Sequence, residues 1–222
     1  MNLDIRTIII ILSFTHLMQV LVFYLQYKVN KVYKGIGWWL MWSAAESIGF
    51  AFILLRSIPS LLNTAIIGQN AVIFAGTIFI YIGVMRFFDK KENLKIVIPA
   101  FVSYVILILF FLFINNNIQI RSCITNIAYA FISFLTAGSL YKYKIRSIKA
   151  SVNFNTAVFI IHGGIFLYRA YLIFTGTSVS EVFTPSLFNV LPYFDALVVS
   201  LLWTFGFIIM VNQRLNSEMT EA

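Results

Sequence analysis

The chain of 222 residues is 60% hydrophobic and only 11% charged, and its mean hydropathy is +0.90. Globular domains carry about 25% charged residues, so this composition excludes a water-soluble domain and predicts an all-α integral membrane protein. A net charge of +8 favours a nucleic-acid partner in a soluble protein, but these basic residues punctuate apolar runs, so we expect membrane lipid as the partner and no nucleic acid.

Seven apolar stretches lie between the polar breaks of the chain, and each is about long enough to cross a bilayer as a helix. They comprise residues 7–27, 37–55, 63–85, 96–114, 121–141, 154–174 and 191–211. The first stretch follows Asp4 and Arg6 and precedes no small-residue cleavage site, so it is a transmembrane helix rather than a signal peptide. The sequence predicts one seven-transmembrane helix bundle over residues 1–211, followed by a cytoplasmic segment over 212–222.

Lysine and arginine are unequally divided between the two predicted sides of the membrane. Twelve lie in the C-terminal tail or near the connections after the first, third and fifth stretches, whereas four lie toward the other side: Arg6, Arg56, Arg121 and Arg169. Cytoplasmic loops of membrane proteins are enriched in these residues. We therefore expect a multi-pass protein of the cell (inner or plasma) membrane, with its amino terminus outside and its carboxyl terminus in the cytoplasm.

Side-chain types in the second and fourth stretches predict their surroundings. The second opens with Trp38, Trp39 and Trp42, which we expect at the cytoplasmic interface as part of an aromatic belt. Gly49 of the same stretch lets a neighbouring helix approach closely. The fourth stretch, 96–114, is apolar nearly all round, so we expect it at the periphery of the bundle.

Three charged residues, Glu46, Arg169 and Asp195, fall well inside the predicted spans. A charge near mid-membrane costs on the order of 3 kcal/mol on insertion scales, so such residues face the bundle interior, pair with each other or line a wet cavity. No lysine lies in any span, which excludes a retinal Schiff base.

Arg169 and Asp195 both lie roughly 8 Å from the outer ends of their helices, at a rise of about 1.5 Å per residue. We hypothesise a polar cavity that is open to the outside, with Arg169 as its cationic anchor for a small-molecule ligand. The predicted ligand-binding residues are Glu46, Gln69, Asn70, Asn126, His162, Arg169 and Asp195. The alternatives are a structural Arg169–Asp195 ion pair, snorkelling of Arg169 to the headgroups, and an ion or proton path.

Two histidines, His16 and His162, lie at comparable depths on different helices, which is also the arrangement of a bis-histidine haem site or a proton relay. Ser, His and acidic residues follow no catalytic order, the single cysteine is Cys123, and no metal-binding or nucleotide-binding motif is present. We expect no catalytic residue, metal or cofactor in this chain. A haem-binding protein remains one alternative, and a small transporter, which usually shows an internal repeat, remains another.

The last helix continues past the membrane. Ile208, Asn212, Leu215, Met219 and Ala222 follow a 4, 3, 4, 3 spacing, which is typical of a heptad seam. We expect this segment to form a homodimer and Asn212, Leu215 and Met219 to transmit a signal. Because neither Gly nor Pro ends the helix, we also expect the chain to be truncated before an output domain.

Several segments resemble one family: GIGWW at 35–39, RSIP at 56–59, Asn70, GVMRFF at 83–88 and TFGFIIMVNQRLNSEM at 204–219. The chain is similar to the seven-transmembrane amino-terminal sensor module that precedes bacterial and archaeal GGDEF-type diguanylate cyclases and PAS or sensor histidine kinase domains. The resemblance implies a sensory receptor for two-component or cyclic-di-GMP signalling. In that family the last helix runs into an N-x-R-L-x-x-E signalling helix, whose positions are occupied here by Asn212, Arg214, Leu215 and Glu218.

Overall fold

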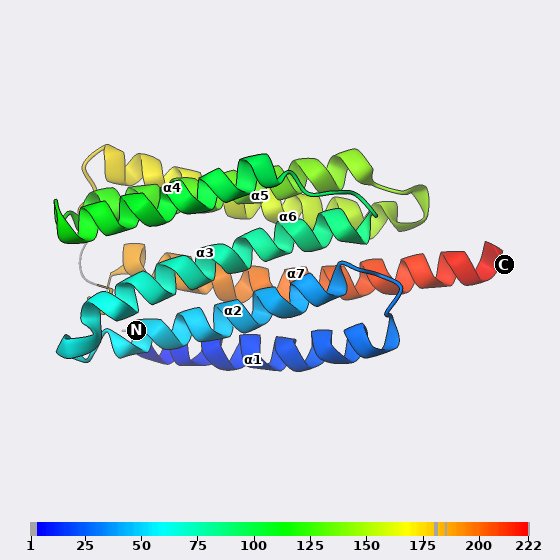
Figure 1. Ribbon diagram of the computed structural model, residues 1–222, viewed down its shortest axis with the longest axis horizontal. Coiled ribbons are helices and arrows are strands. Elements are labelled where there is room, and N and C mark those ends of the chain that lie inside the picture. Colours follow the sequence, from blue (N-terminus) through cyan, green and yellow to red (C-terminus); the bar gives the residue numbers. More distant parts are fainter. Residues whose placement is uncertain (1–3, 180–181, 185, 222) are drawn as a thin grey trace.

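Seven long α-helices make up most of the computed structural model, which describes residues 4–179, 182–184 and 186–221 (Figure 1). Their bounds are α1 (Ile5–Val29), α2 (Ile36–Leu55), α3 (Leu62–Phe87), α4 (Leu94–Phe113), α5 (Ile118–Tyr143), α6 (Lys149–Phe174) and α7 (Leu187–Glu221). Two short 3-10 helices, η1 (Pro59–Leu61) and η2 (Arg146–Ile148), precede α3 and α6, and no strand occurs among the described residues. Each predicted stretch corresponds to one long helix, and each long helix is long and apolar enough to cross a membrane. The predicted seven-helix architecture is confirmed.

Side-chain caps fix the beginnings of two of these helices. The Asp4 carboxylate accepts a hydrogen bond from the Arg6 backbone N–H at 3.1 Å, and the Asn117 side chain accepts one from the Ile120 N–H at 3.1 Å. Such caps satisfy backbone donors that have no partner within the first helical turn. Because of the Asn117 cap, α5 begins three residues before the stretch predicted from hydropathy.

Successive helices run antiparallel and define two ends of the bundle (Figure 1). We call one the amino end, where α1 begins and where the α2–α3, α4–α5 and α6–α7 connections lie; the opposite end is the carboxyl end. Helix α4 contacts α3 and α5 and is the least buried of the seven, which agrees with its predicted peripheral position. Helix α7, at 35 residues, is the longest and projects beyond the other helices at the carboxyl end (Figure 1).

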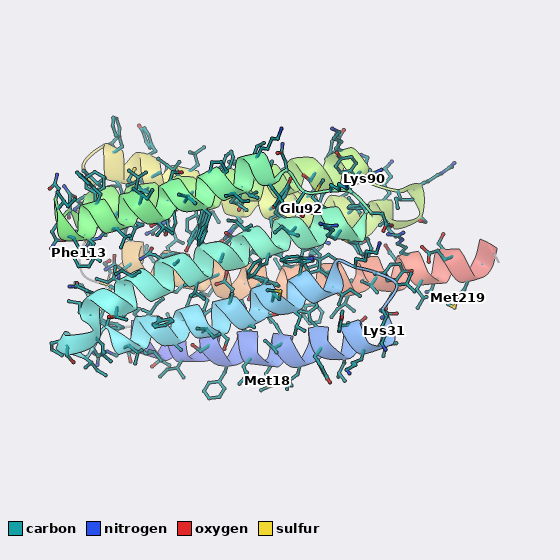
Figure 2. All side chains as sticks on the ribbon, viewed as in Figure 1. Met18, Lys31, Lys90, Glu92, Phe113 and Met219 are labelled. Carbon is teal, nitrogen blue, oxygen red and sulfur yellow. The ribbon has the colours of Figure 1, made fainter. Side chains whose placement is uncertain are left out.

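The outward surface of the bundle is apolar along the middle of the helices. Phe14, Met18, Ile161 and Phe205 are all exposed, and Figure 2 labels Met18 on the outer side of α1. Lys31 and Lys90 instead lie near the carboxyl end, as do other basic side chains (Figure 2). An apolar waist with charged ends is the surface that a bilayer requires of a helical protein.

An aromatic layer fills the centre of the bundle. The indole of Trp39 stacks on Phe207 with ring centroids 4.2 Å apart, and Trp203 stacks on Phe159 at the same distance. Trp42 meets Trp203 edge-on at 5.9 Å. Helices α2, α6 and α7 are therefore held together by ring contacts between their inward faces.

The prediction of an aromatic belt at the interface is wrong for two of its three tryptophans. Trp39 and Trp42 are 0% and 1% exposed, and both belong to the main hydrophobic core. They are three residues apart on α2, so they share one face of the helix, and that face points inward. Trp38, on the next face, is half-buried and contacts the ring of Phe79.

Several glycines allow close helix contacts, among them Gly49 and Gly206. A Cβ at Gly49 of α2 would overlap Ile73 of α3, which confirms the predicted close approach at Gly49. A Cβ at Gly206 of α7 would overlap the carboxamide of Asn155 on α6, a residue that is 0% exposed. Both contacts depend on the absence of a side chain.

Candidate functional site

A cavity of about 200 Å³ lies inside the bundle, in its amino-end half. Side chains from α1, α2, α3, α5, α6 and α7 line it, together with Val179 and Val182 of the α6–α7 connection. It extends from helix-end residues such as Arg56 and Ile118 to the indoles of Trp42 and Trp203. The aromatic layer of the core therefore forms its floor.

The structure brings most of the predicted ligand-binding residues together around this cavity. Six of the seven line it: Glu46, Gln69, Asn70, Asn126, His162 and Arg169. They come from α2, α3, α5 and α6, so residues separated by more than a hundred positions in the sequence share one wall. Asp195 is not part of the lining and lies behind His162.

Arg169 is held rigidly in the cavity wall. Its Nε donates a hydrogen bond to Asn126 Oδ1 at 3.2 Å, its Nη1 donates to the Phe188 carbonyl, and its Cζ lies 4.1 Å from the centroid of the Phe188 ring. Only 5% of the residue is exposed, so the side chain does not snorkel to the surface of the bundle. Within the described part of the chain, no carboxylate lies within 4 Å of its guanidinium.

The hypothetical Arg169–Asp195 ion pair is not formed. Asp195 Oδ2 lies 2.6 Å from Nδ1 of His162, and both side chains are at least nine-tenths buried. His162 lies two helical turns from Arg169 toward the carboxyl end, and the start of α7 places Asp195 at the level of the histidine. The imidazole is held between the rings of Phe166 and Trp203, at centroid distances of 4.8 and 4.9 Å.

Among the described residues that line the cavity, three carry a guanidinium group and one, Glu46, carries a carboxyl group. Arg56 at the C-cap of α2 and Arg121 in the first turn of α5 lie at the amino end with Arg169, whereas Glu46 lies nearly three turns deeper along α2. Arg121 Nη1 donates to the Phe111 carbonyl at 2.5 Å and to Asn116 Oδ1 at 2.7 Å. The amino end of the cavity is therefore where the guanidinium groups among the described lining residues lie.

Arg56 and Arg121 are cavity residues that the sequence interpretation missed, because it assigned both to the outer side of the membrane as topology signals. A signal was present in the helical spacing. Arg121, Thr125 and Tyr129 recur every four residues and share one face of α5. Arg56 likewise continues the face of α2 that carries Glu46 and Phe50, which also line the cavity.

An apolar belt separates this cationic end from the floor. Phe50 of α2, Ile73 of α3, Tyr129 of α5, Phe166 of α6 and Ala196 of α7 lie one or two turns below the arginine level and line the cavity. Wall groups of this kind favour a ligand with an apolar body and a few placed polar groups.

The floor again carries polar groups. Glu46, His16 and Ser200 line it beside the two indoles, and Gln19 Nε2 donates to Ser200 Oγ at 3.4 Å. His16 stacks on Phe50, with centroids 5.5 Å apart. The rings of Trp42 and Trp203 contact each other, and they separate the two histidines: Trp42 contacts His16, and Trp203 contacts His162. Among the described residues, no cluster of three His, Cys, Asp or Glu side chains suits a metal ion.

Two wall amides are oriented by their own helices. Asn70 Nδ2 donates to the Ile66 carbonyl at 2.7 Å, and Asn126 Nδ2 donates to the Ser122 carbonyl at 2.6 Å. These bonds direct the amide oxygens elsewhere: Asn126 Oδ1 accepts from Arg169, and Asn70 Oδ1 accepts from the Tyr104 hydroxyl of α4 at 2.8 Å. The peripheral helix α4 is thus hydrogen-bonded to the cavity wall.

A second polar cluster lies at the carboxyl end, where the projecting part of α7 meets the loops. We call it the clasp; it comprises Tyr33, Phe87, Asp89, Arg214 and Glu218. Arg214 Nη1 donates to the Phe87 carbonyl, Nη2 lies 3.3 Å from Asp89 Oδ2, and Nε donates to Glu218 Oε1 at 2.9 Å. Glu218 Oε2 accepts from the Tyr33 hydroxyl at 2.9 Å. Burial and this hydrogen bond raise the pKa of Tyr33 to about 12, so the hydroxyl remains a donor at neutral pH.

The predicted heptad seam on α7 divides between two environments. Leu215 is half-buried and packs against the main core, whereas Asn212 and Met219 are exposed. Ala222 lies outside the described residues. Of the three predicted transmission residues, Leu215 therefore contacts the bundle, and the other two face away from it.

No family model matches the chain, and no curated protein or solved structure is detectably similar to it. The fold and its surface alone define the class: the architecture is that of a multi-pass membrane protein with seven candidate spans. Within that class, the chain is distinguished by its cationic cavity at the amino end and its clasped helix at the carboxyl end.

Proposed function

We propose that this chain is the membrane sensor module of a signalling protein. It binds a small ligand in the cavity and transmits the binding event along α7 to an output domain on the other side of the membrane. The excess of lysine and arginine near the carboxyl-end connections supports an orientation in which the amino end faces outside and the clasp faces the cytoplasm. The membrane is the cell (inner or plasma) membrane.

One observation carries the proposal: α7 belongs to both clusters. Tyr193 and Ala196 line the cavity, while Arg214 and Glu218 of the same continuous helix form the clasp. The two ends are separated by roughly 30 Å, given a rise of about 1.5 Å per residue. A shift of α7 that is favoured by a ligand in the cavity therefore acts directly on the clasp.

The mechanism is a population shift between two placements of α7. A ligand that contacts the cavity wall more favourably in one placement increases the population of that placement. The contacts of Arg214 with Asp89 and the Phe87 carbonyl hold the other end in the placement described here. Asn212 and Met219 are already exposed in this placement, so the signalling dimer forms through their face, and release or rotation of the extension changes how the two copies meet.

The floor of the cavity supports a receptor over a conduit. Trp203 of the floor stacks on Phe159, and Trp39 stacks on Phe207 further toward the carboxyl end; all four rings are at most 5% exposed. A pore that is open to both sides needs a second opening toward the carboxyl end, and this packed layer occupies that route.

Cysteine labelling tests the coupling between cavity and extension. In a Cys123→Ser background, Met219→Cys reports on the α7 extension, and Tyr141→Cys on α5, which has a similar exposed fraction at the same end, serves as the matched control. A panel of small carboxylates, amines, sugars and nucleosides is screened by thermal unfolding of the purified chain. We expect a stabilising compound to change the maleimide labelling rate at position 219 and to leave the rate at 141 unchanged.

Two results would contradict the proposal. A stabilising compound that changes neither labelling rate would show that binding is not transmitted along α7. Accumulation of that compound inside proteoliposomes, relative to empty liposomes, would show that the protein is a transporter.

A further inference from the structure

The most unusual group in the bundle is the guanidinium of Arg169, because it is buried without a carboxylate. The residue is 5% exposed, and the described residues offer no ion pair to it within 4 Å. The carboxylate of Asp195 contacts His162 instead. A buried charge is stable only when it is paired or well hydrogen-bonded, so this position is suited to an anion that comes from outside the chain.

The guanidinium is also oriented for such an anion. Of its five N–H groups, one is donated to Asn126 and one to the Phe188 carbonyl, and the Phe188 ring covers one face. The remaining donors, including both hydrogens of Nη2, make no hydrogen bond to any residue that the structure describes. A fixed, planar set of free donors matches the two oxygens of a carboxylate.

The charge distribution along the cavity gives the ligand a direction. Arg169 places a positive charge at the amino-end level of the cavity, so an anionic group is attracted there. At the floor, His16, Glu46 and Ser200 offer hydrogen-bonding groups, which suit an uncharged polar group.

The belt between these levels determines the body of the ligand. Phe50, Ile73 and Phe166 present apolar surface there, and the whole cavity measures about 200 Å³. Apolar surface of this kind contributes affinity in proportion to the area that it covers. A short alkyl or aryl group fits the belt, and a sugar or a free inorganic ion leaves it unfilled.

We propose that the ligand is a small organic carboxylate with an apolar body, bound with its carboxylate on Arg169 and its body in the belt. This inference rests on the proposed function, since it concerns the same cavity, and it adds the chemical class that the cavity selects.

Calorimetry on the purified full chain in nanodiscs tests the chemical class. The probes are straight-chain monocarboxylates from acetate to octanoate, the matched primary alcohols and amines, and inorganic phosphate. We expect the acids to bind, with an affinity that rises about fourfold per methylene until the belt is filled. The alcohols and amines of equal length bind at least tenfold more weakly.

Variants assign the binding to this site. Arg169→Gln is expected to weaken acid binding roughly tenfold or more. Arg169→Lys keeps the charge but loses the planar set of donors, so its affinity for the acid should lie between those of Arg169→Gln and the wild type. Arg146→Gln removes the same charge from an exposed position at the carboxyl end and serves as the control. Ala196→Leu fills part of the belt without touching Arg169, so it shifts the optimum to a shorter acid even if Arg169→Gln fails to fold.

Three outcomes would overturn the inference: equal binding of alcohols or amines, unchanged acid binding in both Arg169→Gln and Ala196→Leu, or binding of phosphate with no binding of any acid. The last outcome would indicate a phosphate or lipid-headgroup site. Each is separable from failure of the sensor proposal. An acid that binds at Arg169 but leaves labelling at Met219→Cys unchanged would refute transmission and leave the ligand class intact.

Discussion

The Nδ1 atom of His162 lies 2.6 Å from Oδ2 of Asp195, and this contact engages the Asp195 carboxylate two helical turns away from Arg169. Within the described part of the chain, the guanidinium of Arg169 has no carboxylate within 4 Å. The first prediction concerns this pair.

Asp195→Ala is expected to lower the stability of the protein by about 2 kcal/mol, because it leaves the imidazole of His162 buried without its partner. For a chain of this size the loss corresponds to roughly 4–8 °C in Tm. Thermal unfolding followed by circular dichroism measures it, with Ser103→Ala on the exposed side of α4 as the control. A double-mutant cycle should show coupling between positions 162 and 195, and stronger coupling between 169 and 195 would contradict the assignment.

Gly206→Ala is expected to destabilise the bundle by about 1–3 kcal/mol, because its Cβ overlaps the buried carboxamide of Asn155. The chain offers a matched control in Gly164, which lies on α6 with open space at its Cβ position. Gly164→Ala should be neutral or stabilise by about 0.5–1 kcal/mol, since alanine is the better helix former. Equal melting temperatures for the two variants would refute the close contact between α6 and α7.

Arg214→Ala is expected to loosen the projecting part of α7, because Arg214 joins it to the Phe87 carbonyl and to Asp89. Amide hydrogen exchange over residues 212–221 should speed up, while exchange in the cavity-lining part of α7 remains slow. Tyr33→Phe removes only the hydrogen bond to Glu218 and should give a smaller increase. Exchange that is as slow in Arg214→Ala as in the wild type would show that the clasp does not restrain the extension.

The loop between α3 and α4 should give the protein a pH dependence in the acid range. Glu92 Oε1 accepts a hydrogen bond from Arg86 Nη2 at 2.7 Å, and Oε2 lies 2.7 Å from Arg86 Nε. Burial opposes ionisation of Glu92, but the contacts with Arg86 outweigh it and hold the pKa of the carboxyl below its usual value. A lowered pKa stabilises the folded state above the unfolded pKa, and this contribution is lost as the pH falls through the folded pKa.

At pH 7, Glu92→Gln is therefore expected to have a lower Tm than the wild type. The difference in Tm should shrink as the pH falls below about 4, the usual pKa range of a carboxyl group. Thermal unfolding of both proteins between pH 7 and pH 3 checks this. A difference that stays constant over the range would contradict a role for the ionised carboxylate.

Much of this architecture follows from the sequence, because a bilayer constrains it strongly. Runs of about 20 apolar residues must be helices in order to satisfy their backbone groups, and the seven observed helices match them. Because a charged side chain inside a membrane span is unfavourable, the sequence predicts that Glu46 and Arg169 face the bundle interior, and the structure places both in the cavity wall.

The remaining features depend on how the helices are rotated and how deep each one lies, which hydropathy does not specify. The partner of Asp195 is set by where α7 begins, after the α6–α7 connection, and a shift of two turns along α6 separates His162 from Arg169. The inward direction of Trp39 and Trp42 similarly follows from packing against Phe207 and Trp203 of a distant helix. The residue pattern of α2 alone does not predict these contacts, because the partner residues lie far away in the sequence.

The two indoles at the floor of the cavity make the protein its own optical reporter. Trp42 and Trp203 line the cavity and touch each other, while the other two tryptophans, Trp38 and Trp39, do not line it. A molecule that enters displaces water near these two rings and alters the wavelength and yield of their emission. Replacing Trp38 with Phe reduces the background at a half-buried position, so occupancy can be followed in the purified protein without any attached dye.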